Sequence, residues 1–126
     1  MSLNSWPFFD EIDINSTSKV LASGKVNYFT GNQGKLFEKE FANWSNNNYS
    51  IAMANGSLAL CAAYLSLNLK KDDEVITTPR TFIATSSELI NSGLRPVFAD
   101  VNRDSGVIDV DSIEKSITKK TKAISV

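Results

Sequence analysis

The chain has 126 residues, of which 42% are hydrophobic and 21% charged, which is enough for one domain with an apolar core. A net charge of −1 without a basic stripe argues against nucleic acid as a partner, and no apolar run reaches the roughly 18 residues of a membrane span. The absence of histidine excludes Ser-His-Asp chemistry and most zinc sites from this chain. The single cysteine, Cys61, and the lack of a secretory pattern indicate a reduced, cytoplasmic protein.

The beginning of the chain predicts a helix followed by a turn-rich loop. Residues 10–23 carry acidic side chains in the first turns of the expected helix, and Gly24 is placed to end it. Residues 25–34 are extended and then rich in turn formers. The segment 31–35 superficially resembles a phosphate loop, but it lacks the required first glycine and the Ser or Thr after the lysine. We therefore interpret it as a solvated loop.

Residues 35–45 predict an amphipathic helix. Its aromatic side chains fall at positions i, i+4 and i+7 of one helical face: Phe37, Phe41 and Trp44. A stripe of this kind usually packs in a core, so we expect that face to be buried.

The centre of the chain predicts a strand, a sharp turn and a helix. Residues 49–54 are an apolar run typical of a buried strand, and residues 58–65 are apolar on nearly every side, as in a buried helix. Between them lie Gly56, which permits a close backbone approach, and Ser57, which is a good N-cap. Such a turn directs free N–H groups and the positive end of a helix dipole at one point, which suits a phosphate. A capped helix start without a ligand explains the turn equally well.

The second half of the chain alternates strands with helices. Strands are expected at residues 74–78, 96–101 and 122–126, and helices at residues 83–92 and 110–118. Gly93 is placed to end the first of these helices, and Asp109 or Asp111 to begin the second. This alternation predicts βαβ units and a parallel sheet. A buried parallel strand seldom ends a domain, so we expect the chain to be the N-terminal piece of a larger protein.

Two predicted strand ends carry distinctive chemistry. Ligands of open α/β sheets bind beyond the carboxyl ends of the strands. One such end leads into the turn at residues 55–57, and the other, at residues 78–82, brings the aromatic ring of Phe82. A phosphate site beside an aromatic ring suits pyridoxal phosphate or a nucleotide, although Phe82 alone is more simply a core aromatic. The dinucleotide fingerprint G-x-G-x-x-G is missing, which disfavours NAD.

In their order and spacing, these segments resemble the N-terminal third of the DegT/StrS-type sugar-nucleotide aminotransferases, which are pyridoxal-phosphate enzymes of the aspartate-aminotransferase fold. The resemblance is carried by residues 7–11, the loop at Gly31, and residues 37–41, 55–60, 73–77, 81–85, 96–101 and 121–124. It implies an α/β fold, as the N-terminal part of the three-layer α/β/α large domain of fold type I, with a mostly parallel sheet. Residues 1–34 would form an N-terminal helix and a segment near the active site, and residues 35–126 the first part of the cofactor-binding large domain.

The resemblance also implies pyridoxal 5'-phosphate as the cofactor and four residues that bind it. Gly56, Ser57 and Leu58 would bind the phosphate through backbone N–H groups and the Ser57 hydroxyl, and Phe82 would stack on the ring. The lysine that carries the cofactor and the aspartate that pairs with the ring nitrogen would lie beyond Val126. We therefore assign no catalytic residue and no metal ligand here, and expect the 126 residues alone to be inactive.

The implied function is transfer of an amino group from glutamate or glutamine onto a keto-sugar nucleotide, in polysaccharide biosynthesis. The protein would be a cytoplasmic homodimer with no nucleic-acid or membrane partner. Three alternatives remain open: a pyridoxal-phosphate-dependent sugar dehydratase of the same family, a non-catalytic nucleotide- or phosphate-binding α/β module, and a folded piece with no independent function.

Overall fold

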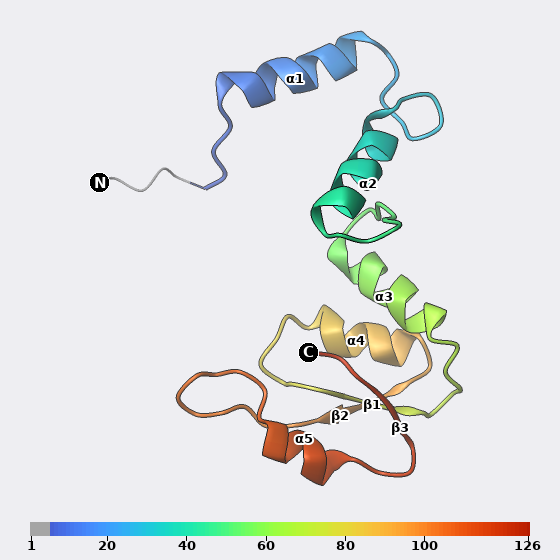
Figure 1. The fold of residues 1–126 in the computed structure, drawn as a ribbon, viewed down its shortest axis with the longest axis vertical. Coiled ribbons are helices and arrows are strands. Elements are labelled where there is room, and N and C mark those ends of the chain that lie inside the picture. Colours follow the sequence, from blue (N-terminus) through green and yellow to red (C-terminus); the bar gives the residue numbers. More distant parts are fainter. Residues whose placement is uncertain (1–5) are drawn as a thin grey trace. The chain divides into compact units, whose positions relative to one another are not determined.

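The computed structural model describes residues 6–126 (Figure 1). The chain divides into two compact units, Met1–Ala52 and Met53–Val126, and each is described by itself below. The first five residues of the predicted segment 1–34 lie outside the described residues. The predicted boundary at residue 34 divides the chain by expected role, whereas the boundary after Ala52 divides it by compactness. The boundary at residue 34 therefore stays a prediction.

The first unit contains two helices, α1 (Glu11–Ala22) and α2 (Gln33–Trp44). Asp10 begins α1 with a capping box: its carboxylate accepts from the Asp13 N–H at 2.9 Å, and the Asp13 carboxylate accepts from the Asp10 N–H at 3.2 Å. Gly24 follows the helix with φ +66°. Both helices are confirmed within two residues of their predicted ends.

The loop between α1 and α2 is closed by its own polar groups. The Asn27 side chain accepts from the N–H groups of Phe29 and Thr30 at 3.0 Å each, and the Gly31 N–H donates to the Asn27 carbonyl at 2.7 Å. A side chain on Gly31 would begin 2.4 Å from the Lys25 carbonyl oxygen. The loop is therefore a tight turn that is closed by its own hydrogen bonds.

The aromatic face of α2 is exposed, and the prediction that it is buried is wrong for the described chain. Phe37, Phe41 and Trp44 are 55%, 43% and 81% exposed, whereas Ala42 is the buried residue of the helix. The three rings contact one another, with centroid distances of 5.7 Å and 5.4 Å along the stripe. They contact each other because their spacing of four and three residues places them on one helical face.

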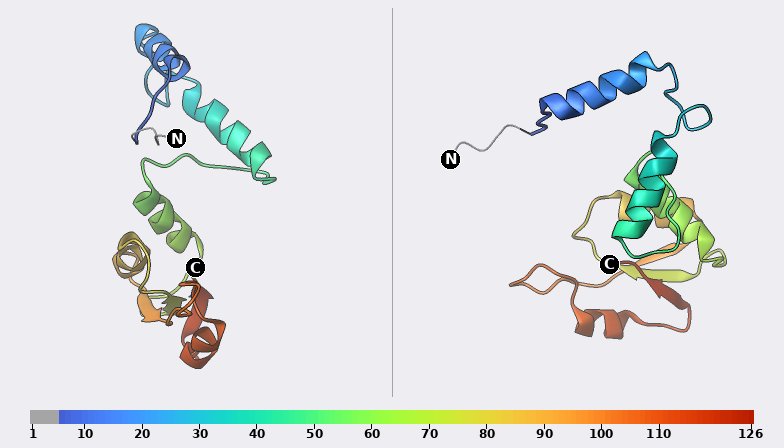
Figure 2. Two further views of the ribbon diagram at one scale, coloured as in Figure 1. Left: turned by 90° about the vertical axis from the view of Figure 1, so that its left-hand side faces the viewer. Right: turned by 45° about the horizontal axis from the view of Figure 1, so that its top comes forward.

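The second unit combines three helices with a three-stranded parallel sheet of order β2-β1-β3. Its elements are α3 (Gly56–Ser66), β1 (Glu74–Thr77), α4 (Ala84–Asn91), β2 (Arg95–Phe98), α5 (Val110–Ser116) and β3 (Thr121–Ile124). The central strand places Val75 opposite Pro96 of β2 and Ala123 of β3. Helices α4 and α5 lie on opposite faces of the sheet (Figures 1 and 2), which confirms the predicted layered α/β fold with a parallel sheet.

The core of this unit lies where α3 and α4 meet the central strand. Tyr64, Val75, Leu89 and Leu94 are buried together, and three partly buried side chains pack around them: Leu60, Leu69 and Ala123. Leu89 is 0% exposed, and a side chain buried to this degree stabilises a fold by about 1.5–3 kcal/mol. This cluster holds α3 and α4 side by side on one face of the sheet.

Two expectations for the central stretch are wrong. Residues 49–54 are not a strand, and Tyr49 and Ile51 are 88% and 78% exposed. A strand needs a neighbour for its backbone N–H and C=O groups, and the described sheet does not extend to this segment. Helix α3 forms as predicted, but Leu58 and Leu65 are 48% and 62% exposed, because only one of its faces meets α4 and the sheet.

The predicted second-half elements are confirmed with small shifts at their ends. The strand expected at residues 96–101 ends at Phe98, and Val101 instead forms an isolated antiparallel bridge with Ile108. Asp109, one of two predicted caps, begins α5, and its carboxylate accepts from the Asp111 N–H at 3.1 Å.

Candidate functional site

The turn before α3 is capped by Asn55, not by Ser57 as expected. Asn55 has an extended backbone (φ −165°, ψ 172°), and its Oδ1 accepts from the Leu58 N–H at 2.9 Å. Ser57 is already the second residue of the helix, since α3 begins at Gly56. Asn55 therefore caps the helix, and the Ser57 side chain is not used for capping.

The start of α3 keeps unused hydrogen-bond donors. Among the described residues, neither the N–H groups of Gly56 and Ser57 nor the Ser57 hydroxyl has a hydrogen-bond partner, whereas the Leu58 N–H is occupied by Asn55. A side chain added to Gly56 would meet no atom within 4 Å. Two free N–H groups and a hydroxyl thus lie at the positive end of a helix dipole, beside open space at Gly56, and this donor set suits a phosphate.

Phe82 is exposed in the loop between β1 and α4, so it is not a core residue of the described unit. Its side chain is 74% exposed, and its carbonyl accepts from the Thr85 N–H at 3.0 Å. The same loop is turned by Thr78, whose Oγ1 accepts from the Arg80 N–H at 3.2 Å. The ring is thus displayed at the carboxyl-terminal side of the central strand, where it can contact a planar ligand.

Thr77, the last residue of β1, is a feature that the sequence analysis missed. It is 0% exposed, and its Oγ1 is buried without a hydrogen-bond partner in the described chain. A buried hydroxyl in this state costs about 1–3 kcal/mol. Threonine is common in strands, so no sequence signal distinguishes this residue from an ordinary strand former.

The predicted site residues come from two neighbouring places in the second unit. Gly56, Ser57 and Leu58 begin α3, and Phe82 precedes α4, which packs against α3. Both elements flank β1, whose carboxyl end carries Thr77. The donor set fits a phosphate and the exposed ring fits a flat heterocycle, so the residues present are suited to pyridoxal phosphate. Their individual roles as cofactor ligands stay predictions.

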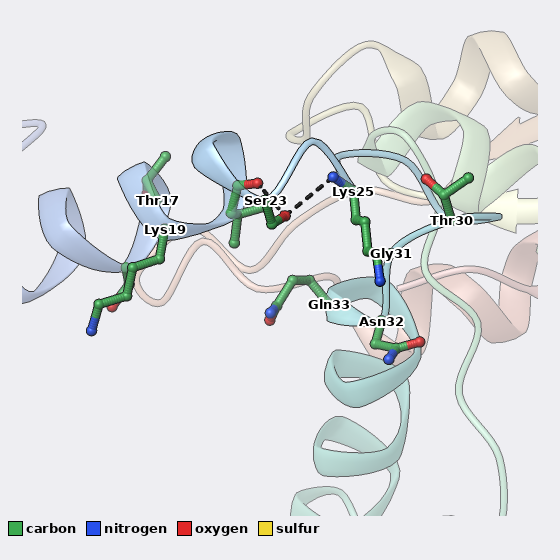
Figure 3. Close-up of a pocket in the computed structure, with 10 residues that line it drawn as sticks. Thr17, Lys19, Ser23, Lys25, Thr30, Gly31, Asn32 and Gln33 are labelled. Carbon is green, nitrogen blue, oxygen red and sulfur yellow. Dashed lines mark hydrogen bonds between the residues drawn. The ribbon is translucent and has the colours of Figure 1, made fainter.

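The first unit has a polar hollow of about 760 Å³ between α1 and the loop before α2 (Figure 3). It is lined by two lysines and by hydroxyl and amide side chains: Ser16, Thr17, Lys19, Ser23, Lys25, Thr30, Asn32 and Gln33. Figure 3 shows the Lys25 side chain extending toward Gly31, whereas Lys19 points away. None of the predicted cofactor residues lines this hollow.

A second polar arrangement in the first unit centres on Glu38 of α2. Its Oε2 accepts from the Tyr28 hydroxyl at 3.0 Å, and its Oε1 accepts from the Ala52 N–H at 2.9 Å. The hydrogen bond and the negative charge of Glu38 raise the pKa of Tyr28 above its ordinary value of 10.0. Lys35 Nζ lies 5.6 Å from the centre of the Tyr28 ring. Through these two hydrogen bonds, Glu38 links Tyr28 in the loop before α2 with Ala52 in the segment after α2.

Within residues 6–126, no helix combines the length and apolar character that crossing a membrane requires. Groups of three or more side chains that could ligate a metal ion are also absent from this range.

Comparison with known proteins gives consistent matches along the chain. A model of the DegT/DnrJ/EryC1/StrS aminotransferase family matches residues 8–126. One curated relative is GDP-perosamine synthase from Escherichia coli O157:H7, which is 37% identical over 94 residues; the match covers 75% of this chain and 26% of the relative. Another is 3-oxo-glucose-6-phosphate:glutamate aminotransferase from Bacillus subtilis, which is 35% identical over 117 residues; the match covers 91% of this chain and 26% of the relative.

Solved structures agree with these matches. The aminotransferase from Psychrobacter cryohalolentis superimposes with a TM-score of 0.92 at 47% identity, covering 98% of this chain and 31% of that one. NtdA from Bacillus subtilis, with bound cofactor PMP, gives a TM-score of 0.79 at 35% identity, covering 88% and 25%. The matches include a GDP-4-keto-6-deoxymannose-3-dehydratase with a TM-score of 0.81 at 28% identity, covering 92% and 31%. The chain spans less than a third of the length of each of these proteins.

Proposed function

The chain belongs to the DegT/DnrJ/EryC1/StrS aminotransferase family, and we propose that the full-length protein aminates a keto-sugar nucleotide with pyridoxal phosphate as its cofactor. The cofactor is supported by the NtdA structure with bound PMP, the aminated form of pyridoxal phosphate. The observation within this chain that carries the proposal is the open, donor-rich start of α3 at Gly56 and Ser57.

Each site residue has a distinct part in the proposal. The N–H groups of Gly56 and Ser57 and the Ser57 hydroxyl hold the cofactor phosphate, and Phe82 covers one face of the cofactor ring. The resemblance also implied the Leu58 N–H as a phosphate donor, but in this structure Asn55 occupies it, so we leave it out of the donor set. When bound, pyridoxal phosphate supplies an electron sink for chemistry at the carbon that bears the amino group. The phosphate contacts keep the cofactor in one orientation between substrates, which is a positional contribution to catalysis.

The remaining features of the enzyme are proposed from the family. Glutamate or glutamine donates the amino group, and glutamate is the donor in the name of one curated relative. We propose that the lysine that carries the cofactor and the aspartate that pairs with its ring nitrogen lie beyond Val126; this chain covers 26% of each of the two curated relatives. We place the enzyme in the cytoplasm as a homodimer.

Substituting Ser57 tests the phosphate assignment. In the full-length protein, Ser57→Ala should weaken pyridoxal-phosphate binding by about 1.5–3 kcal/mol, since a hydrogen bond to a charged phosphate is lost. The measurement is an absorbance titration with pyridoxal phosphate. Ser66→Ala at the other end of α3 is the matched control, because its hydroxyl bonds the Ala63 carbonyl at 2.7 Å and should not affect the cofactor. Unchanged affinity in Ser57→Ala would refute the role of Ser57.

A sugar dehydratase is a second candidate, and the matched dehydratase structure is the observation that favours it. The two reactions differ in their products, so mass spectrometry of a keto-sugar nucleotide incubated with the full-length protein and glutamate separates them. An aminated sugar supports the aminotransferase, and a deoxygenated sugar supports the dehydratase. A non-catalytic nucleotide-binding module would yield neither product and would not alter the absorbance of pyridoxal phosphate.

A further inference from the structure

A buried tyrosine links the two elements that carry the predicted cofactor residues. Tyr64 of α3 is 6% exposed. Its hydroxyl donates to the Thr85 carbonyl of α4 at 3.2 Å and lies 2.9 Å from the Ser125 hydroxyl, just after β3. A tyrosine hydroxyl has a single proton, so while it donates to Thr85, Ser125 must be the donor in the other contact. One hydroxyl therefore connects α3, α4 and the carboxyl end of β3.

Thr85 extends this connection to the loop that displays Phe82. The Thr85 N–H donates to the Phe82 carbonyl at 3.0 Å, and its hydroxyl pairs with that of Thr81 at 3.1 Å. Phe82 itself is 74% exposed, so its ring is oriented by the backbone that carries it rather than by side chains packed around it. The hydrogen bonds run from Tyr64 through Thr85 to the two residues at the tip of the loop.

We propose that Tyr64 is a positioning residue for the cofactor: its buried hydroxyl fixes the Phe82 loop relative to α3, whose first residues carry the phosphate donors. The inference rests on the proposed function, because it assigns Phe82 to the cofactor ring. Polar groups buried in a hydrophobic cluster are normally hydrogen-bonded, and one that bonds to two other elements restricts their relative movement. Leucine or phenylalanine at this position would pack against Val75 and Leu89 but would not hold the loop.

A double-mutant cycle on pyridoxal-phosphate affinity in the full-length protein tests this role. Tyr64→Phe keeps the ring in the core and removes only the hydroxyl. It should weaken binding by about three- to tenfold, the range for one ordinary hydrogen bond, and alter the circular dichroism of the bound cofactor. In a Phe82→Leu background the same substitution should have no further effect, because the ring that Tyr64 positions is gone. Tyr49→Phe is the matched control, since Tyr49 is 88% exposed, and should leave affinity unchanged.

The outcomes separate this inference from the proposed function. If the wild-type protein does not bind pyridoxal phosphate, the proposed function fails. If it binds, but Tyr64→Phe has no effect or the same effect in both backgrounds, Tyr64 does not act through Phe82 and the inference is overturned. If Tyr64→Phe does not fold, Thr85→Pro serves instead: it keeps the carbonyl that Tyr64 bonds but removes both hydrogen bonds from Thr85 to the loop, and proline is tolerated in the first turn of a helix. It should weaken binding in the wild-type background and not in Phe82→Leu, and wild-type affinity in Thr85→Pro would overturn the inference.

Discussion

Substitutions of Asn55 separate the stability of α3 from its proposed binding of a phosphate. In the structure, the Asn55 Oδ1 accepts from the Leu58 N–H at 2.9 Å, next to the unoccupied N–H groups of Gly56 and Ser57. Asn55→Ala removes this cap and should destabilise the protein by about 1 kcal/mol. Asn55→Asp keeps the acceptor and adds a negative charge that favours a helix N-terminus by about 0.3–1 kcal/mol. The aspartate variant should therefore be as stable as the wild type.

The same aspartate should weaken the binding of pyridoxal phosphate. A phosphate bound to the N–H groups of Gly56 and Ser57 would lie within one helical turn of residue 55. The phosphate and the carboxylate introduced by Asn55→Asp would therefore be about 5 Å apart. Two unit charges at that distance repel by about 1–3 kcal/mol for effective dielectric constants between those of water and a protein surface. This corresponds to a loss of affinity of roughly five- to 150-fold. Since the pair is partly exposed, the loss should shrink as salt is raised.

The assay combines thermal unfolding with absorbance titration by pyridoxal phosphate, both on the full-length protein at low and high salt. Asn55→Ser, which keeps a neutral cap, is the control and should match the wild type in both measurements. If Asn55→Asp is as stable as the wild type and binds pyridoxal phosphate equally well at low salt, the cofactor phosphate does not bind at the start of α3.

Two further predictions concern the structure away from the cofactor. Gly106→Ala should destabilise the protein by about 1–2 kcal/mol in chemical unfolding, because Gly106 has φ +69°, a conformation that is strained for alanine. An equally stable variant would contradict this backbone conformation. The phenol of Tyr28 should titrate above pH 10.0 in ultraviolet difference spectra and return toward that value in Glu38→Gln. Because the pKa of Tyr28 is higher in the folded than in the unfolded protein, its contact with Glu38 stabilises the fold fully below pH 10.0, and this stabilisation is lost as the pH rises through the folded-state pKa. An unchanged Tyr28 titration in Glu38→Gln would exclude the contact.

The sequence predicted the second unit well, because its elements are determined by local signals. Val75 and Ile76 lie in a short apolar run, Gly93 has the positive φ that ends α4, and Asp109 caps α5. The parallel sheet follows from the alternation of such elements along the chain. Each of these patterns depends only on neighbouring residues, so it can be recognised in the sequence without knowing the fold.

Burial was predicted less well, because it depends on what covers a face. Phe37 and Leu65 have the spacing of core residues, yet they are 55% and 62% exposed in the described chain. Residues 49–54 have the composition of a strand but no neighbouring strand in the described sheet. Periodicity shows which side of an element is apolar, but it does not show whether another surface reaches that side.

The candidate site was predicted in part. Turn chemistry and the family resemblance point to the start of α3 and to the Phe82 loop, and their binding of a cofactor stays a prediction. The structure decides only the cap, which is Asn55 rather than Ser57. The Tyr64 hydrogen bonds were missed, because they join residues 21 and 61 positions apart in the sequence. A tyrosine within an apolar helix gives no sequence signal that its hydroxyl has distant partners.

A crystal structure of the full-length protein with pyridoxal phosphate would show directly whether the start of α3 binds the cofactor phosphate. We predict that the cofactor phosphate lies within about 2.7–3.2 Å of the backbone nitrogens of Gly56 and Ser57, with the Phe82 ring against one face of the pyridine ring. A phosphate bound elsewhere, with the start of α3 facing only solvent, would contradict the account.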